Sequence, residues 1–327
     1  MSSFRPSPPD EDPLGLSLER GLQREPLTDE ALGRIRASVE AEFQALAHRA
    51  RRLQVVRWTA LAAALAILVV GGALRLRSAP HTPLLAGTIE RVDSGALSVR
   101  LGLFQSHAAS SGELLHTGER WVATGSVVIT LASGGTLRMA PGTSIEASRP
   151  NQMELFAGRA YLDFAPGTAA FALDTPLGSI EHVGTQFEAA IVEDNLRVRV
   201  REGTVRVFGA SSTVTAEKGT ELSIPPTGAI VRRPIPTYGP EWAWVDALAP
   251  DYDIENKPLI DFLSWVGRET GRRVDFADEH VRAVARETLL HGSVQGLKPL
   301  DALDRVLSTT SLRFELQGDS IRVSSRR

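Results

Sequence analysis

The sequence contains no cysteine among its 327 residues. Disulfide bonds, thiolate nucleophiles and zinc sites built on thiolates are therefore excluded. The absence does not identify a compartment, because a domain outside the cytoplasm can fold without disulfides. An apolar content of 43% is that of ordinary packed domains, and this length suggests two or three of them.

A long basic stripe is also missing, and the formal net charge is −3. Proteins that bind nucleic acid neutralise many phosphates with lysine and arginine, usually gathered on one face. The composition therefore argues against nucleic acid as the main partner.

Signatures of catalysis and of metal binding are missing as well. The sequence has no glycine-rich phosphate loop, no GxSxG elbow and no HExxH motif. Its seven histidines are scattered, and no two have the i, i+3 or i, i+4 spacing of helical metal ligands. We therefore predict no catalytic residue, no cofactor and no metal site. An enzyme that acts on envelope polymers is the hypothesis with the least support.

One apolar run without charge is present, from Trp58 to Leu74. Its 17 residues are at the short end of what crosses the hydrocarbon core, and flanking arginines can extend it by snorkelling. A buried core helix would normally have a polar face over this length. A cleaved signal peptide fits poorly, because 57 residues precede the run and Arg77 stands where a small residue is needed before Ala79. The run predicts a transmembrane helix.

The charges that flank this run predict its orientation. Only Arg75 and Arg77 follow it closely, and more arginines precede it. Because positive charge is retained in the cytoplasm, the N-terminus is expected inside and the C-terminus in the periplasm of a bacterial inner membrane. The arginines that determine this orientation are Arg49, Arg51, Arg52 and Arg57.

An apolar stripe at helical spacing precedes the run, after Thr28 as a suitable N-cap. A stripe of this kind cannot be buried within a 57-residue tail. It either binds a cytoplasmic protein or lies on the surface of the lipid bilayer, and the arginines near the membrane suit the second alternative. The stripe consists of Leu32, Ile35, Val39, Phe43 and Leu46.

After a linker at residues 75–84, the sequence pattern changes to short predicted strands in which apolar and polar residues alternate. Turn signals recur about every ten residues, which is typical of an all-β sandwich or solenoid. Alternation suits both architectures, and the tight glycine-punctuated repeats favour the solenoid. We expect this all-β domain to occupy residues 85–224 and a proline-rich linker to follow at 225–241.

The last segment, residues 242–327, has a different period. An apolar stripe predicts a helix from Leu259 that ends at Gly271, and Pro299 opens a second helix. The pattern suggests a small α+β domain with the order βαββαββ and two helices on one sheet. Its predicted strands are residues 252–255, 273–276 and 288–294, followed by a hairpin at 312–323.

An arginine row is the sharpest charged feature of the β segment. Arg197, Arg199 and Arg201 alternate with apolar residues, so they share one face of a strand. This face is either solvated and paired with acids across the sheet or a docking surface for an acidic partner. Trp265 is either a packing residue or an anchor of an interface. These four residues are the candidates for a periplasmic binding surface.

The stretch LDTPLGSIEHVGTQFEAAI, residues 173–191, resembles part of an active site because it contains Asp174, Glu181 and His182. Its prolines and glycines explain it more simply as strands and turns. We expect Gly184 to adopt a positive φ or to allow close backbone approach, and His182 to be a strand residue.

Four motifs in this region resemble the FecR family of bacterial inner-membrane signalling proteins. They are an L-x-G-x-A strand pair, a T-P-x-G turn, a G-T-x-F turn and a terminal V-x-E-G-x-V-x-V segment. In this sequence they are Leu155 to Tyr161, Thr175 to Gly178, Gly184 to Phe187 and Val200 to Val207. The C-terminal segment is similar to the short domain shared by secretins and TonB-dependent transducers.

The resemblance implies a relay that holds a sigma factor in the cytoplasm and reads an outer-membrane transporter, such as a TonB-dependent transducer, from the periplasm. The sequence departs from the family in one respect, since residues 1–57 lack the tryptophan-containing motif of the cytoplasmic region. Two hypotheses follow: a transmembrane regulator with a cytoplasmic protein partner, or an anchored periplasmic scaffolding module without one.

Overall fold

The computed structural model describes Gly33 and residues 83–326, except 94, 103–104, 183 and 210–211. The predicted apolar run Trp58–Leu74, its flanking arginines and the apolar stripe from Leu32 to Leu46 lie outside these residues. No helix in the described part of the chain is both long and apolar enough to cross a membrane. Residues 82–327 form one compact unit.

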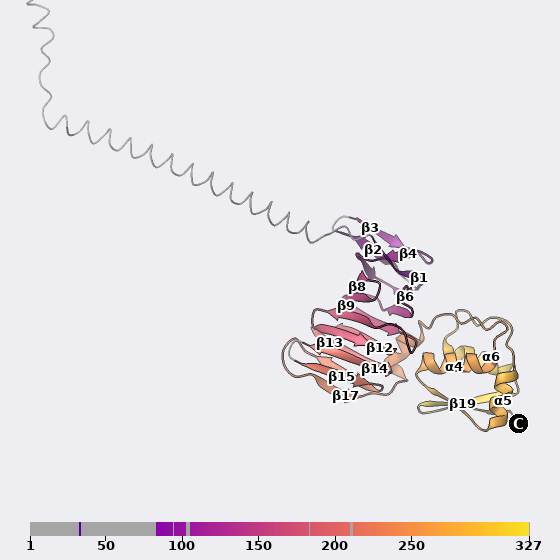
Figure 1. Cartoon of the computed structure of the whole chain (residues 1–327). Coiled ribbons are helices and arrows are strands. Elements are labelled where there is room, and N and C mark those ends of the chain that lie inside the picture. The colour runs from indigo at the N-terminus through magenta and orange to yellow at the C-terminus, as the bar shows by residue number, and fades with distance from the viewer. Residues whose placement is uncertain are drawn as a thin grey trace, which may run out of the picture. The chain divides into compact units, whose positions relative to one another are not determined.

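Two antiparallel sheets build the first part of this unit (Figure 1). We call them sheet A and sheet B. In sheet A the strands run in the order β4 (Leu114–His116), β1 (Leu85–Asp93), β6 (Ser126–Leu131), β7 (Thr136–Met139), the second half of β9 (Gln152–Asp163), β12 (Gln186–Val192), β13 (Asn195–Glu202), β16 (Thr220–Ile224) and β17 (Val231–Pro234).

Sheet B has the order β3 (Gln105–Ala109), β2 (Leu97–Leu101), β5 (Glu119–Ala123), β8 (Ser144–Arg149), the first half of β9, β10 (Phe171–Thr175), β11 (Gly178–His182), β14 (Thr204–Gly209) and β15 (Thr213–Glu217). Among the described strands of sheets A and B, only β9 and β10 pair in parallel. β9 belongs to both sheets, because its residues up to Ala157 pair with β8 and those from Gly158 pair with β12.

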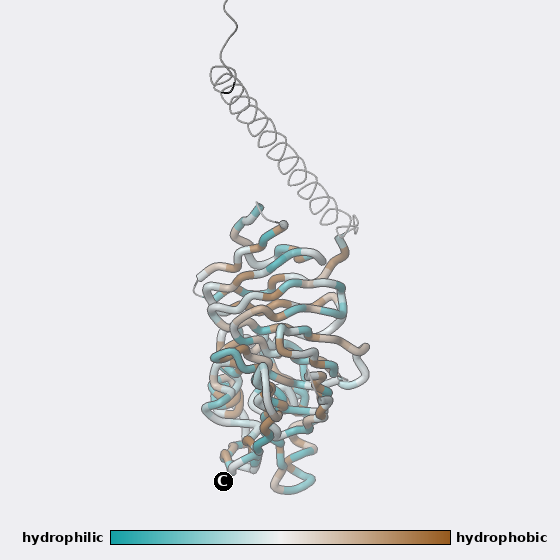
Figure 2. Tube along the Cα trace, turned by 90° about the vertical axis from the view of Figure 1, so that its left-hand side faces the viewer, coloured by the Kyte–Doolittle hydropathy of each residue, from teal (hydrophilic) through white to brown (hydrophobic). Residues whose placement is uncertain are grey.

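A single apolar core fills the space between the sheets. Leu196, Val198 and Val200 of β13 point into it, as do Val205 and Val207 of β14. Along the tube in Figure 2, apolar and polar residues accordingly alternate within the strands. The layering is that of a sandwich, and the prediction of an all-β domain is confirmed. The structure does not form the solenoid that the regular turns favour, because such turns also suit hairpins that alternate between two facing sheets.

The stretch at residues 173–191 forms strands and turns, as its turn residues predict: a hairpin of β10 and β11, followed by β12. Pro176 and Leu177 connect β10 to β11. Gly184 has a φ of 61°, and a Cβ there would lie 2.8 Å from Cα of Pro166. Both expectations for Gly184 are therefore confirmed, and His182 lies in strand β11.

His182 is buried in an aromatic cage. Its ring stacks on Phe164 with centroids 4.0 Å apart, and Phe171 and Phe187 lie within 6 Å. Neither ring nitrogen has a hydrogen-bond partner in the described part of the chain. Burial without a partner disfavours the imidazolium and lowers the pKa of His182 from 6.5 to about 4.

The C-terminal part is a small α+β domain, and it differs from the predicted order. Its helices pack on a three-stranded sheet in the order β18-β20-β19, in which β18 and β20 are parallel. The elements are η1 (Pro240–Trp242), α3 (Ala243–Asp246), α4 (Leu259–Thr270), β18 (Arg273–Phe276), α5 (Glu279–Glu287), α6 (Pro299–Ser308), β19 (Leu312–Gln317) and β20 (Ser320–Ser325).

The predictions for α4, β18, α6 and the final hairpin are confirmed. The strand predicted at 252–255 does not form, and that at 288–294 is reduced to one bridge between Leu289 and Pro258. The sequence pattern did not predict helix α5, because its apolar stripe is too short to show helical periodicity. Only Val281 and Ala285 of this stripe are buried. Its start is nevertheless encoded, since the Asp278 side chain caps it by accepting from the Val281 amide.

The segment predicted as a linker at 225–241 contains strand β17, which pairs with β16. The proline at its end, Pro234, is tolerated because β17 is an edge strand.

The cage of His182 generates a prediction about pH. Because the folded state binds this proton only near pH 4 while the unfolded chain binds it near 6.5, stability is lost as the pH falls between these values. Between pH 8 and pH 5 the contribution of His182 to the loss is about 2 kcal/mol. Urea unfolding at both pH values should show a correspondingly smaller loss for His182→Phe.

The control is His280→Gln, which replaces an exposed histidine of α5. This variant should lose stability with pH like the unaltered protein. Equal pH dependence in His182→Phe and the unaltered protein would contradict the account of the cage.

Candidate functional site

The most developed polar site lies where the C-terminal part packs on the outer face of sheet A. We call it the junction, and it consists of the outward side chains of β7, β9, β12 and β13 together with residues 235–272. Outward positions of a strand normally face water. At the junction they are covered, so the sandwich and the C-terminal domain are parts of one body.

A fully buried ion pair forms its centre. Nη2 of Arg138, from β7, lies 2.6 Å from Oε2 of Glu269 on α4, and the two side chains are 0% and 5% exposed. Nη1 of Arg138 also donates to the carbonyl oxygen of Val245, at 2.9 Å. Burial raises the pKa of Glu269, and the charge of Arg138 opposes this effect. Charges this deeply buried are tolerated only when they are paired.

Arg201 of β13 makes the second contact. Its Nη2 lies 2.8 Å from Oδ1 of Asp246, and its Nε donates to the carbonyl oxygen of Thr237 at 2.9 Å. The guanidinium also lies 5.0 Å from the ring centroid of Trp242. One arginine therefore holds both the connecting segment and the short helix α3.

Arg268 of α4 makes the third contact, in the opposite direction. It donates to the carboxylate of Asp163 at the end of β9, to Oε2 of Glu202 at 3.1 Å and to the carbonyl oxygen of Phe164 at 3.1 Å. Gln186 donates to the other oxygen of Asp163 at 2.8 Å. Cations on both sides of the junction thus meet carboxylates of the other side, which fixes the register of the two parts.

Aromatic residues fill the space between these polar contacts. The rings of Tyr161 and Trp242 meet edge to face with centroids 6.1 Å apart, and Val245 completes their cluster. Nε1 of Trp242 donates to the carbonyl oxygen of Pro236 at 2.9 Å, and Nε1 of Trp244 donates to Oε2 of Glu188 at 2.8 Å. The indole N–H groups of Trp242 and Trp244 therefore both have the partner that they need.

Gly271 makes the closest backbone approach at the junction. It ends α4 in the left-handed conformation, with a φ of 63°. A Cβ at this position would collide with the carbonyl oxygen of Thr237 and with Nε of Arg201. The carbonyl oxygen of Gly271 accepts from the Thr237 hydroxyl at 2.7 Å. The sequence predicts the role of Gly271 as a helix terminator, but not this contact.

The predicted arginine row is divided among different environments. Arg201 is 1% exposed and belongs to the junction. Arg199 is also buried and pairs with Glu221 of the neighbouring strand at 2.5 Å. Arg197 is half-buried and pairs with Glu188 at 3.1 Å. Arg197 and Arg199 thus pair with acids of the same sheet, and Arg201 docks on an acid of the C-terminal part. Binding of the row to a separate partner stays a prediction.

Trp265 lies in the C-terminal domain, apart from the arginine row. Its half-buried ring stacks on Tyr252 with centroids 5.1 Å apart, and it also contacts Phe262. Packing therefore accounts for much of its surface, and its role as an interface anchor stays a prediction.

Sequence reasoning missed the buried ion pair of Arg138 and Glu269. An outward arginine on a strand, such as Arg138, gives no sign that another element covers it. Glu269 gives a signal that can be recognised in hindsight, because it follows Phe262 and Val266 at the i+7 and i+3 positions of the same apolar stripe. A carboxylate in such a stripe indicates a buried cation opposite it.

The chemistry of the junction is that of binding between two parts of a chain. Within residues 83–326, apart from the short gaps, no group of three histidine, aspartate or glutamate side chains is placed to hold a metal ion. Every carboxylate described above faces an arginine or an indole rather than an open cavity.

Comparison with known proteins identifies one family. Residues 116–206, from β4 to β14, match the family model described as FecR protein. The matched residues include the four motifs on which the resemblance to this family rests, except Val207 at the end of the fourth. Comparison with curated proteins gives no match.

Two crystal structures of a protein described as "a putative anti-sigma factor", from Parabacteroides distasonis ATCC 8503, are similar in part. Each is 15% identical, with a TM-score of 0.33. The structure at 2.50 Å resolution matches over 62% of this chain and 95% of its own, and that at 1.65 Å over 61% and 94%. The predicted likeness of the C-terminal domain to secretins and transducers is not tested by these comparisons.

The buried ion pair generates a prediction about stability. Glu269→Ala leaves Arg138 buried without a carboxylate, which should cost about 3–5 kcal/mol of unfolding free energy. Urea unfolding measures this loss, and limited proteolysis should cut the variant faster between the two parts. The control is Glu279→Ala, which removes a 73% exposed carboxylate from α5 and should cost less than about 1 kcal/mol. Equal losses in the two variants would contradict a central role for the pair.

Gly271 generates a second prediction with a matched control. Gly271→Ala and Gly296→Ala both place a side chain at a positive φ, of 63° and 72°. A Cβ at Gly296 meets nothing within 4 Å, so this variant should lose only about 1 kcal/mol. Gly271→Ala must also displace Thr237 and Arg201, and its loss should be about 3 kcal/mol or more. Thermal unfolding of both variants measures the difference, and similar losses would show that the junction yields without cost.

Proposed function

We propose that this chain is a single-pass inner-membrane regulator of the FecR type. It relays a periplasmic signal to a cytoplasmic partner through protein–protein contacts. The observation that carries the proposal is the FecR match at residues 116–206, within a sandwich to which a C-terminal domain is docked.

The membrane anchor of this proposal is the apolar run Trp58–Leu74. The arginines Arg49, Arg51, Arg52 and Arg57 before it place the N-terminal tail in the cytoplasm by the positive-inside rule. Residues 82–327 are then the periplasmic part, and their folding without cysteine is compatible with that compartment.

The periplasmic part reads its signal by binding an envelope protein, for which a TonB-dependent transducer is the candidate. The half-buried Trp265 and Arg197 are the parts of the predicted surface that keep exposed atoms. The junction supports a relay, because a partner that binds the C-terminal domain pulls or turns the sandwich with it. Two domains joined by a free linker would not transmit such a change.

The cytoplasmic output of the proposal is capture of a sigma factor by the apolar stripe from Leu32 to Leu46. An amphipathic helix laid in a groove of its partner is an ordinary mode of recognition, with anchors at i, i+3, i+4 and i+7. The stripe has this spacing.

One observation favours a second function, an anchored periplasmic scaffolding module. Residues 1–57 contain no tryptophan, whereas the cytoplasmic region of the family resemblance has a tryptophan-containing motif. In the scaffolding alternative the tail helix lies on the inner leaflet and has no protein partner. The two functions therefore differ in what the tail binds.

A pair of substitutions distinguishes them. Ile35→Asp with Phe43→Asp places two charges in the apolar stripe and should abolish capture of the sigma factor in a crosslinked pull-down from membranes. The control is Ala37→Asp with Ala41→Asp, which adds the same charge on the opposite side of a 3.6-residue helix and should preserve capture. Membrane insertion should be unchanged in both variants.

Deletion of residues 28–50 provides the outcome that decides against the regulator. If only envelope proteins are recovered, and equally from the deletion and the unaltered chain, the scaffolding function replaces it.

A further inference from the structure

Exposed leucines gather around one turn of the sandwich. In the described part of the chain eight large apolar side chains are exposed, and four of them flank the turn at residues 116–119 between β4 and β5. The other four are scattered singly, as is normal for a protein surface. The four leucines, Leu84, Leu85, Leu101 and Leu114, are 53%, 44%, 55% and 53% exposed, and we call them the leucine rim.

Strand pairing brings the backbones of the four leucines together around this turn. Leu85 is opposite His116, and Leu101 is opposite Glu119, at the two ends of the turn. The backbone of Leu84 is hydrogen-bonded to Thr117 within the turn. Leu114 lies two residues before His116 on the same edge strand, β4.

The exposure of Leu101 is not a consequence of strand alternation, whereas Leu114 points outward beside the buried Leu115. Leu101 follows Leu97 and Val99 at alternate positions of β2, and both of those side chains are buried in the core. Alternation therefore directs Leu101 to the core side, yet more than half of its surface is free. The strand extends beyond the core at this end, so an apolar surface that the fold does not cover remains.

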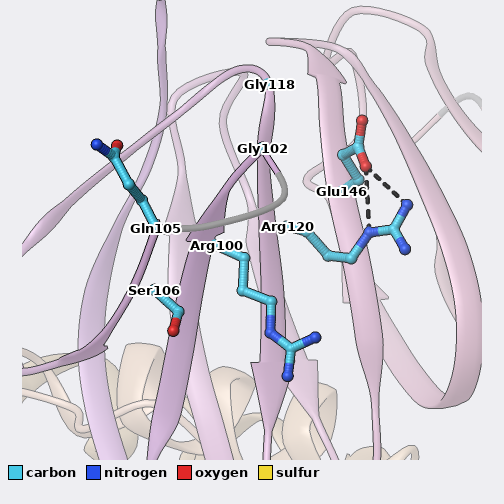
Figure 3. Close-up of a pocket in the computed structure, with 7 residues that line it drawn as sticks. All are labelled: Arg100, Gly102, Gln105, Ser106, Gly118, Arg120 and Glu146. Atoms are coloured by element: carbon cyan, nitrogen blue, oxygen red, sulfur yellow. Dashed lines mark hydrogen bonds and ion pairs between the residues drawn. The ribbon is translucent and has the colours of Figure 1, made fainter.

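A cationic groove adjoins the rim on the outer face of sheet B (Figure 3). It has a volume of about 520 Å³, and the glycine of the same turn, Gly118, lines it. Arg100 and Arg120 are directly opposite each other on β2 and β5. Like charges in this arrangement repel each other and destabilise the strand pair, so an anion that binds between them would reduce this repulsion.

The two arginines differ in their availability. Arg120 bonds Glu146 at 3.0 Å and lies 3.8 Å above the ring of Phe156. Arg100 forms no ion pair with any described residue, and Figure 3 shows its side chain extended away from the Arg120–Glu146 pair. Arg100 is thus the free cation beside the leucine rim.

We propose that the leucine rim and Arg100 rest on the membrane, with the leucines in the interface and the guanidinium on a lipid phosphate. The proposal depends on the proposed function, because it takes Trp58–Leu74 as the anchor. Leu84 follows Leu74 by ten positions, so the rim begins at most about 35 Å along the chain from the end of the span. Leucine beside arginine is the composition that suits the headgroup region.

Contact with the bilayer would give the sandwich a defined orientation on the membrane. A pull on the C-terminal domain, transmitted through the junction, would then lift the rim. In this proposal the protein without a signal has the rim on the membrane, and the signal removes that contact.

The absence of cysteine makes the test direct. The full chain, in nanodiscs of phosphatidylcholine and phosphatidylglycerol in equal parts, carries one fluorophore on a single introduced cysteine. The rim variants are Leu101→Cys and Leu114→Cys, and the controls are Leu289→Cys and Leu316→Cys, whose parent side chains are 54% and 45% exposed in the C-terminal domain. A lipid with a nitroxide in its headgroup should quench the first two and not the others.

A second substitution tests the phosphate contact. Arg100→Gln should shift the rim label at position 114 about fivefold towards the unquenched state, since one basic residue near an anionic surface contributes roughly that factor. Arg282→Gln, an exposed arginine of α5, should leave quenching unchanged.

The outcomes separate this inference from the proposed function. If the chain does not remain with the nanodiscs in size-exclusion chromatography, the anchor is wrong and both proposals fail. If it remains but the rim labels are quenched no more than the controls, the anchor stands and the resting contact is overturned. Protection of the unquenched rim labels from aqueous iodide would likewise overturn it, in favour of a protein that covers the rim.

Discussion

The ion pair between Arg138 and Glu269 is the interaction on which the rest of the architecture depends. It lies between a strand of the sandwich and a helix of the C-terminal domain, and both side chains are buried. A buried charge requires its partner, so each part of the chain is incomplete without the other. The contacts of Arg201 and Arg268 repeat this arrangement in both directions and leave one orientation in which all carboxylates are paired.

This constraint gives a physical basis to the relay that we propose. In that proposal a signal acting on the C-terminal domain reaches the sandwich only if the two move together, and the contacts of α4 at the junction would provide this coupling. The paired charges also make the coupling specific, because hydrophobic contacts alone would allow sliding. At the opposite region of the sandwich, the leucine rim offers a surface that is apolar and cationic. The junction and the rim therefore belong to one compact unit.

Much of the fold could be predicted from alternation and turn chemistry. The β segment, the αL end of α4 at Gly271 and the proline start of α6 depend on local rules, and the structure follows them. Helix α5 was missed since its apolar stripe is too short for periodicity to detect. The strands expected at 252–255 and 288–294 have suitable residues but no neighbouring strand to complete them. Local propensity does not determine whether a partner is present.

The sequence by itself determined the two kinds of secondary structure, the change from an all-β to an α+β segment, the motifs that resemble the FecR family and the apolar run that we interpret as a membrane span. All of these follow from neighbours along the chain, where spacing decides which face is apolar. Only the tertiary structure decided which of the outward charges are exposed, paired or buried. Arg197, Arg199 and Arg201 form one pattern in the sequence, but one remains half-exposed, one pairs within its sheet and one is covered by a distant helix. Burial depends on which distant element packs on a face, and strand periodicity shows only which residues share that face.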